Sequence, residues 1–317
     1  MHPLARACPA SRQHLAREHL ADAGISRYGL EALLRSGGLL RIRRGVYAPA
    51  PLPVRARHLL SGGLPDPAYV AEVRAVLLSL GADCAAAGRT AAVLWGMDMF
   101  VEPRLVEVNV PTGRSRVALP GVDATRRADG GVVELGVLGC EGLPVTTALV
   151  TVVECALTRP LREAVVIADS ALRRGLITLD ELVAAVGARS RRPGARRLRG
   201  VLEFVDPACE SVLESLFRVL ALEQGLHPES QVTVRRPGGG RVGRFDFCFR
   251  EQRLIVECDG RRWHDPEDVR EKDRRKDNEL ARLRWRLLRI TWDDVVHHPD
   301  YVGRLLKDCL APQDTAA

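Results

Sequence analysis

Residues 244–264 (RFDFCFREQRLIVECDGRRWH) contain two apolar runs on either side of a polar turn. The runs RFDFCF and LIVEC are rich in aromatic and β-branched residues, which favours two strands. Residues 250–253 form a connection short enough for a hairpin. Because side chains alternate between the two faces of a strand, we expect the three phenylalanines to share one face and Asp246 to share the other with Cys248. The sequence therefore predicts an antiparallel hairpin whose faces differ in polarity.

The register of this hairpin brings two carboxylates together. A turn that closes symmetrically over residues 250–253 places Asp246 directly opposite Glu257. The same register places Arg244 opposite Asp259. Directly opposed Cβ atoms lie about 4.5–5.5 Å apart, and carboxylates so close repel each other unless a proton or a cation lies between them. Such a pair suits Mg²⁺, which proteins hold through one or two carboxylates with phosphate and water. The alternative is an edge hairpin whose polar face is only hydrated.

The residues around this hairpin resemble a known fold. Asp246, the run IVECDG and the pair Trp263-His264 together look like the PD-(D/E)XK endonuclease fold. Within that fold the pattern is similar to the very-short-patch-repair (Vsr-like) endonucleases and to a related bacterial family of unknown function. The resemblance covers roughly residues 207–310 and includes Glu214 on the preceding helix and Gln231 on the preceding strand.

The resemblance implies a catalytic site for cutting DNA. It implies that Asp246, Glu257 and Glu214 hold Mg²⁺ or Mn²⁺. Asp259 would lie near the ion, and His264 would act as the general base or hold the attacking water. Two positions depart from the pattern. Asp259 stands where a lysine is usual, and arginines precede the Trp-His pair where the Vsr-like pattern has a zinc-binding cysteine, so we expect no structural zinc.

Length and composition allow several packed domains. The chain has 317 residues, 46% of them hydrophobic, which supports cores in two or three domains. No apolar run reaches the roughly 18 uncharged residues of a membrane-spanning helix, and the first residues lack the apolar segment of a signal peptide. The eight cysteines form no CxxC pair, so we expect reduced thiols and a cytoplasmic location.

The basic charge is concentrated at the start of the chain. The net charge is +7, and the first 57 residues alone contain ten arginines against three acidic residues. A local basic excess is the electrostatic pattern of a nucleic acid-binding surface. A solvated basic surface that improves solubility is the alternative.

Residues 11–48 show the pattern of two helices followed by a hairpin. Ser11 can cap a first helix that carries Leu15 and Leu20, and Ser26 can cap a second. The basic run RIRRGVYA then alternates as a strand and turn. This order is typical of a winged helix-turn-helix, and the segment resembles the N-terminal domain of AbiEi-type antitoxins. A small helical docking module is the alternative. The side chains expected to contact DNA are Arg27, Tyr28, Arg35, Arg41, Arg43 and Arg44.

These patterns predict a multi-domain α/β protein. A winged helix-turn-helix domain spans residues 1–58, an AbiEi-like α+β domain spans 59–200, and a Vsr-like endonuclease-fold α/β domain spans 201–317. The leading hypothesis is a bacterial DNA-binding protein with a Mg²⁺-dependent endonuclease domain that hydrolyses phosphodiester bonds. The alternative is a non-catalytic AbiEi-type antitoxin or transcriptional regulator with a degenerate nuclease fold. Under either hypothesis the partners expected for the chain are DNA and, through the middle domain, a toxin or another protein.

Overall fold

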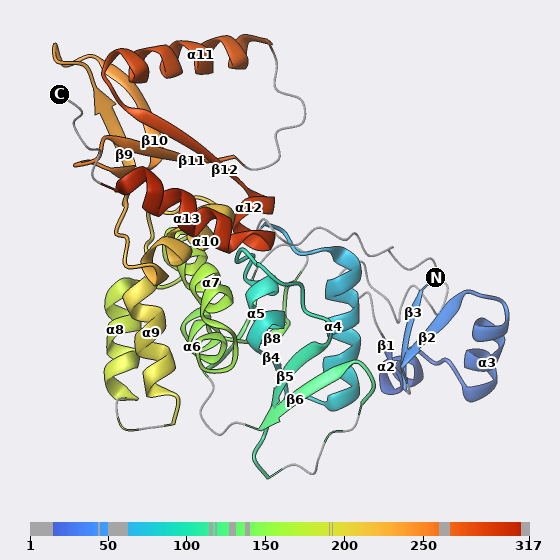
Figure 1. The fold of residues 1–317 in the computed structure, drawn as a ribbon. Coiled ribbons are helices and arrows are strands. Elements are labelled where there is room, and N and C mark those ends of the chain that lie inside the picture. Colours follow the sequence, from blue (N-terminus) through green and yellow to red (C-terminus); the bar gives the residue numbers. More distant parts are fainter. Residues whose placement is uncertain are drawn as a thin grey trace. The chain divides into compact units, whose positions relative to one another are not determined.

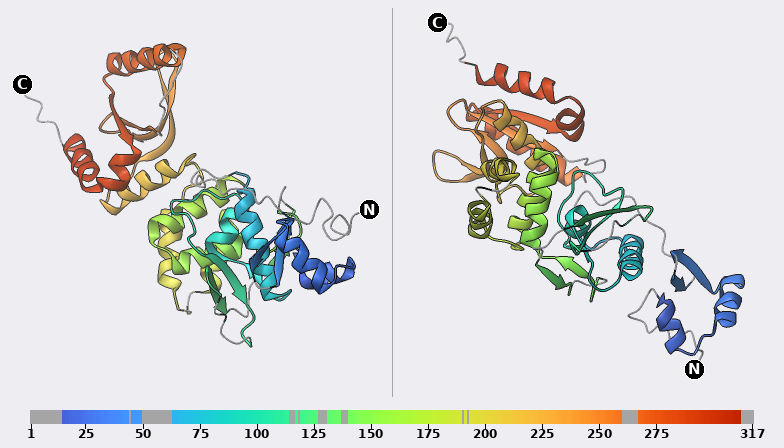
Figure 2. Two further views of the ribbon diagram at one scale, coloured as in Figure 1. Left: turned by 90° about the vertical axis from the view of Figure 1, so that its right-hand side faces the viewer. Right: turned by 90° about the horizontal axis from the view of Figure 1, so that it is seen from below.

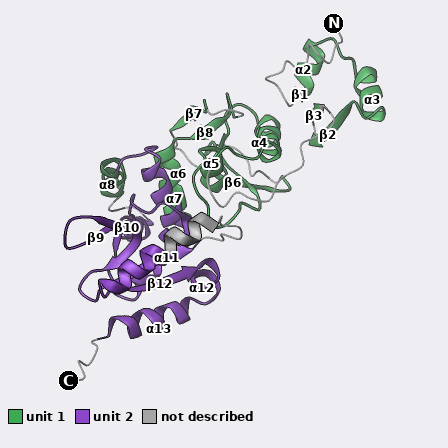
Figure 3. Cartoon of the chain, turned by 90° about the horizontal axis from the view of Figure 1, so that it is seen from above, with its two compact units in different colours: residues 1–159, 179–189 green, residues 160–178, 190–317 purple. Residues whose placement is uncertain are grey.

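The computed structural model describes residues 15–43, 45–49, 63–113, 117, 119–126, 131–136, 140–189, 191, 193–259 and 267–311. They form a mixed α/β structure (Figure 1), as predicted. The chain divides into two compact units (Figure 3): unit 1 comprises residues 1–159 and 179–189, and unit 2 comprises residues 160–178 and 190–317. Within the described ranges, no helix has the length and apolarity to cross a membrane.

Unit 1 begins with helices and a small antiparallel sheet in the strand order β1-β3-β2. The elements of this part are β1 (Leu15–Ala16), α2 (Arg17–Asp22), α3 (Arg27–Arg35), β2 (Leu39–Arg43) and β3 (Val46–Pro49). Ser26 caps α3, as predicted, because its Oγ accepts from the N–H of Gly29 at 3.2 Å. The buried residues of this small core are Leu15, Leu20, Leu30, Leu39 and Tyr47.

The first predicted helix begins later than expected. Leu15 lies in β1, where it pairs with Tyr47 of β3, and α2 begins only at Arg17. The prediction that Leu15 lies on a helix is therefore wrong, although its side chain is buried as expected. Leu15 reaches the core from a strand because β1 pairs with the edge of β3 that β2 does not occupy. The proposed cap Ser11 lies outside the described residues.

The rest of unit 1 contains a five-stranded mixed sheet in the order β6-β5-β4-β8-β7. Its strands are β4 (Ala85–Ala86), β5 (Val106–Val110), β6 (Val122–Arg126), β7 (Val132–Glu134) and β8 (Pro144–Thr146). The helices of this part are α4 (Pro67–Leu80), α5 (Gly88–Leu94), α6 (Ala148–Thr158) and α8 (Leu179–Ala188).

Unit 2 contains a four-stranded sheet in the order β12-β11-β10-β9. β10 runs antiparallel to β9 and β11, whereas β11 and β12 are parallel. Helix α11 lies on one side of this sheet, and α10, α12 and α13 lie on the other (Figures 1 and 2). The strands are β9 (Glu229–Arg235), β10 (Arg241–Phe249), β11 (Leu254–Asp259) and β12 (Arg286–Thr291). The helices are α7 (Leu161–Arg173), α9 (Ala195–Phe204), α10 (Val212–Glu223), α11 (Glu267–Arg282), α12 (Trp292–His297) and α13 (Pro299–Leu310).

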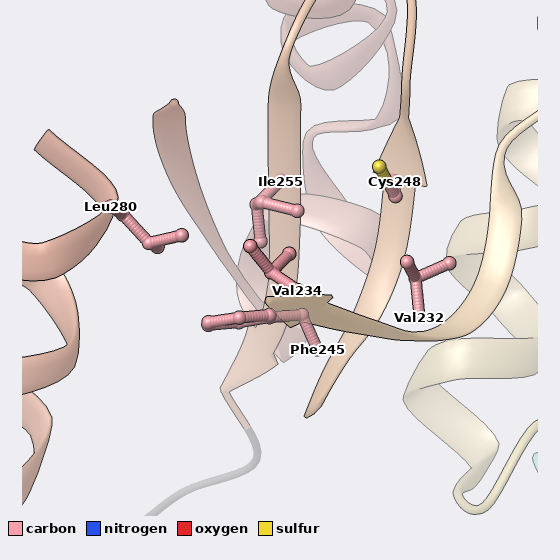
Figure 4. Packing of buried hydrophobic residues seen from close by; sticks show 6 residues of the cluster. All are labelled: Val232, Val234, Phe245, Cys248, Ile255 and Leu280. Atoms are coloured by element: carbon pink, nitrogen blue, oxygen red, sulfur yellow. The ribbon is translucent and has the colours of Figure 1, made fainter. Parts of the chain in front are cut away.

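Aromatic side chains of β10 pack on both sides of this sheet. Phe245 belongs to a cluster with Cys248 and with Leu280 of α11 (Figure 4). The ring of Phe247 instead contacts Phe217 of α10, with ring centroids 5.0 Å apart. The prediction that the phenylalanines share a face opposite Cys248 is therefore wrong. The strand departs from simple alternation beside Gln231 of β9, whose φ of 54° is unusual for a strand residue.

The compact units group the helices differently from the predicted domains. α7 and α9 belong to unit 2, together with the four-stranded sheet, although both begin before residue 200. The division into a winged helix-turn-helix over residues 1–58 and a middle domain over 59–200 stays a prediction.

Candidate functional site

The hairpin of unit 2 has the register predicted from the sequence. Phe249 pairs with Leu254, and Phe247 pairs with Val256. Asp246 and Glu257 are the next residues along these two strands. The carboxylate of Asp246 also reaches β11 directly, since its Oδ2 accepts from the backbone N–H of Cys258 at 2.8 Å. The structure therefore brings the predicted carboxylates together at the end of the β10–β11 ladder.

Asp246 is half-buried, and its surroundings act on its charge in opposite directions. Burial raises the pKa of its carboxyl group, and the carboxylates of Glu210 and Asp259 raise it further. The hydrogen bonds from Cys258 and from the Gln231 side chain lower the pKa again, but burial is the largest cause. A carboxylate in this environment is stabilised by any cation that replaces the lost water.

Glu214 reaches the same region from the first turn of α10. Its side chain is buried, and its Oε2 accepts from Gln231 Nε2 at 2.7 Å and from the Glu210 N–H at 2.8 Å. Burial raises the pKa of Glu214, and the Asp246 charge adds to this effect. Gln231 thus contacts both Glu214 and Asp246, and its positive φ is backbone strain of the kind that accumulates at functional sites.

Glu210 precedes α10, which begins at Val212 after the cap Ser211. Glu210 pairs with Arg244. Asp259, which the register places opposite Arg244, has its ion pair with Arg289 instead.

Arg289 is a site residue that the sequence pattern does not reveal. It lies on β12 directly beside Glu257 in the parallel register of β11 and β12. Its Nε lies 3.8 Å from Glu257 Oε2 and 3.8 Å from Asp259 Oδ2, and its Nη2 donates to both carboxylate oxygens of Asp277 at 2.9 Å. Burial raises the pKa of Glu257, against the lowering effect of the positive charges of Lys276 and Arg289.

These side chains form an acidic centre with a guanidinium at its edge. In the part of the chain that the structure describes, no group of three or more His, Cys, Asp or Glu side chains is arranged to hold a metal ion. The carboxylates of Asp246 and Glu257 are oxygen donors of the type that Mg²⁺ prefers, and this ion needs only one or two of them beside water and phosphate. His264, the predicted general base, lies outside the described residues.

The predicted DNA-contacting residues have different surroundings in the small N-terminal sheet and helices. Tyr28 of α3 is 82% exposed. Arg27 pairs with Glu31 at 3.3 Å, and Arg35 donates to the Glu31 carbonyl at 3.4 Å. Arg43 donates to the carbonyl of Pro120 at 2.9 Å, which occupies part of its hydrogen-bonding capacity.

The other two predicted contacts lie on the hairpin. Arg41 is exposed on β2, and Arg44 is outside the described residues. Among the described members of the set, Arg27, Tyr28, Arg35 and Arg41 are all exposed.

Comparisons with known proteins define the class of the C-terminal domain. Residues 219–310 match the family model REase_MTES_1575, a restriction endonuclease-like family. This segment contains β9 to β12, so the sheet that bears Asp246 and Glu257 has a restriction endonuclease-like fold.

Longer matches come from Mycobacterium tuberculosis. The chain is 28% identical over 286 residues to the uncharacterized proteins MT2308 (strain CDC 1551 / Oshkosh) and Rv2248 (strain ATCC 25618 / H37Rv). The match covers 89% of this chain and 94% of each relative. The crystal structure of the RV2827C protein from the same species aligns at 20% identity over 71% of this chain and 84% of that chain, with a TM-score of 0.42, too low to assign a shared fold.

Proposed function

We propose that the C-terminal domain hydrolyses phosphodiester bonds of DNA with Mg²⁺ or Mn²⁺ held by Asp246 and Glu257. The observation that supports this most is the position of the two carboxylates at the end of one hairpin, in a domain that matches a restriction endonuclease-like family. Glu214 adds a third carboxylate from α10. Buried and half-buried acidic groups whose pKa values are raised by burial and by one another are typical of catalytic centres.

The donor atoms suit a hard divalent cation better than zinc. Oxygen ligands select Mg²⁺ or Mn²⁺, whereas zinc sites use thiolate and imidazole. The nearest thiol, Cys258, is half-buried, and burial raises its pKa, which opposes formation of a thiolate. When bound, the cation would polarise the phosphate and lower the pKa of a coordinated water.

The side chains of the chain itself have defined tasks in this proposal. The backbone N–H of Cys258 orients Asp246, and the side chain of Gln231 orients Glu214, through hydrogen bonds. The carboxylates are therefore held in place before the substrate binds. His264 takes a proton from the attacking water. The water oxygen forms a new P–O bond, one P–O ester bond breaks, and the departing oxygen receives a proton from solvent. Asp259 lies beside the centre and interacts with Arg289.

The N-terminal helices and hairpin would hold the DNA. Tyr28 is exposed on α3, and the basic excess of the first 57 residues provides attraction for phosphates. Binding through this part does not need a metal ion, so DNA binding and DNA cleavage are separable in this proposal.

Plasmid cleavage by the purified full-length protein tests the proposal. We expect nicking with Mg²⁺ or Mn²⁺, none with EDTA, and none for Asp246→Ala with any of them. Asp308→Asn removes an exposed acidic charge on α13 of the same unit and is the matched control that should cut normally. Wild-type rates for Asp246→Ala would refute the assignment, provided that the wild-type protein cuts.

A specific observation favours a second function. Asp259 adds a negative charge where the resembling nucleases have lysine, as expected of a nuclease fold that has lost activity. The protein would then be a DNA-binding regulator of the antitoxin kind, acting with DNA and a toxin or another protein. Binding to the promoter of its own operon in EDTA, with no cleavage under any metal condition, would support this function over the first.

A further inference from the structure

The candidate site has an excess of negative charge. Glu214, Asp246, Glu257 and Asp259 bring four carboxyl groups to one end of the sheet, and a phosphodiester would add another negative charge. One divalent cation balances two of them, and the positive charge of Lys276, which acts on Glu257, balances a third. Like charges at this separation repel, so the approach of a phosphate needs a further positive group close to the carboxylates.

Arg289 is in the position to supply that charge. Neighbouring strands lie about 4.8 Å apart, and the parallel register puts Arg289 beside Glu257 on the next strand. Its Nε is within 4.0 Å of both Glu257 and Asp259, at 3.8 Å in each case. Its side chain is 40% exposed, so the guanidinium also faces solvent, from which a substrate would arrive.

The hydrogen bonds of Arg289 leave part of its guanidinium for a ligand. Nη2 donates to both oxygens of Asp277, a partly exposed carboxylate on α11. Among the residues that the structure describes, Nη1 donates to none. The pair with Asp277 is partly exposed to solvent, so a phosphate can compete with Asp277 for the guanidinium.

We propose that Arg289 is the phosphate-binding cation of this site, and that its guanidinium exchanges Asp277 for the phosphate of DNA at which cleavage occurs. The planar fork of arginine matches two oxygens of one phosphate. This inference rests on the proposed nuclease function and adds to it a residue that contacts the substrate. It also assigns Asp277 a task, which is to hold Arg289 near the carboxylates until DNA binds.

The test compares Arg289→Gln, Arg289→Lys and the matched control Arg250→Gln in the full-length protein. Arg250 is an exposed arginine of the turn between β10 and β11, in the same unit, and it pairs with Glu229. Its replacement therefore removes the same charge and one ion pair away from the carboxylates. Two quantities are measured: the single-turnover rate of duplex cleavage in Mg²⁺, and the dissociation constant for Mn²⁺ without DNA, by electron paramagnetic resonance.

We expect Arg289→Gln to cut about 100-fold more slowly, in the range found when one donor to a developing charge is removed. Arg289→Lys should fall between this variant and the wild type, because it keeps the charge and loses the fork. Mn²⁺ should bind Arg289→Gln as tightly as the wild type or up to about fivefold more tightly, since a positive neighbour of Glu257 is gone. Arg250→Gln should match the wild type in both quantities.

The two readouts separate the possible failures. Wild-type cleavage by Arg289→Gln would overturn the role of Arg289 and leave the nuclease function intact. Weaker Mn²⁺ binding by Arg289→Gln, together with slower cleavage, would show a structural role and would also overturn the proposal. If the wild-type protein neither binds Mn²⁺ nor cleaves DNA, the nuclease function is refuted and the role of Arg289 with it.

Discussion

A buried ion pair in unit 2 leads to a prediction about stability. Arg218 of α10 and Asp169 of α7 have side chains that are 5% and 0% exposed, and their Nη2 and Oδ2 atoms lie 3.0 Å apart. Asp169 Oδ1 also accepts from the Asp206 N–H at 2.7 Å, and Arg218 Nε donates to Cys209 Sγ at 3.3 Å. The pair therefore joins two helices to the loop that precedes the candidate site.

Replacement of Arg218 by methionine should be strongly destabilising. Methionine preserves most of the side-chain volume but leaves Asp169 as a buried charge without its cation. Removing one partner of a buried pair costs about 3–5 kcal/mol in the free energy of unfolding. Arg162→Met is the matched control, because Arg162 and Glu223 join the same two helices through a pair that is 32% and 34% exposed. Its loss should cost at most about 1 kcal/mol.

Urea unfolding of the full-length variants measures these costs. Hydrogen exchange of peptides from α7 and α10 assigns the change to unit 2, which matters because a chain with two units need not unfold in one step. A loss below about 1 kcal/mol for Arg218→Met, or a loss equal to that of Arg162→Met, would refute the reasoning.

The pH dependence gives a second check on the same pair. Burial raises the pKa of Asp169 to about 6, although Arg218 and the hydrogen bonds act in the opposite direction. In the unfolded chain an aspartate has a pKa of about 3.9. Between about pH 4 and pH 6, Asp169 is therefore protonated in the folded protein and ionised in the unfolded chain, so folding takes up a proton. The contribution of this group to stability is therefore greatest below about pH 4 and is lost as the pH rises through about 6. The penalty of Arg218→Met should shrink at about pH 4.5, where a neutral Asp169 needs no cation; an equal penalty at pH 4.5 and pH 8 would contradict this.

Two further changes have clear expected outcomes. Gly88→Ala should destabilise unit 1 by about 2–4 kcal/mol in thermal unfolding, because Gly88 has a φ of +52° and an added Cβ would lie 2.2 Å from Glu107 Oε2. Gly81→Ala is the control. Gly81 has a φ of +96° with open space around it, so this change should cost only about 1–2 kcal/mol. Tyr28→Ala should weaken duplex binding in EDTA by more than about threefold, because this side chain is 82% exposed and accessible to DNA. The same exposure means that the melting temperature should not change. Unchanged binding would argue against α3 as the DNA-contacting helix.

The local parts of the candidate site could be predicted from the sequence. The hairpin register follows from a short polar turn and a period of two, and the observed pairs Phe249–Leu254 and Phe247–Val256 match it. Ser26 caps α3 for an equally local reason, since its hydroxyl needs only a backbone N–H three residues later. The restriction endonuclease-like fold was predictable because its motif residues are grouped within one stretch of chain.

Other features needed the tertiary structure because they depend on partners that are distant in the sequence. The opposite packing of Phe245 and Phe247 reflects two different helices on the two sides of the sheet and the unusual backbone of Gln231. Glu214 meets Gln231 only because α10 packs beside the sheet.

By itself, the sequence determined which strands form the hairpin and which carboxylates end it, because those outcomes depend on alternation and turn length within about twenty residues. Only the tertiary structure placed Arg289 beside Glu257. The two residues lie on parallel strands, and parallel strands need a long crossover, here the segment that includes α11. The register of β11 and β12 is set by how that helix packs on the sheet, and no local pattern in the sequence predicts it.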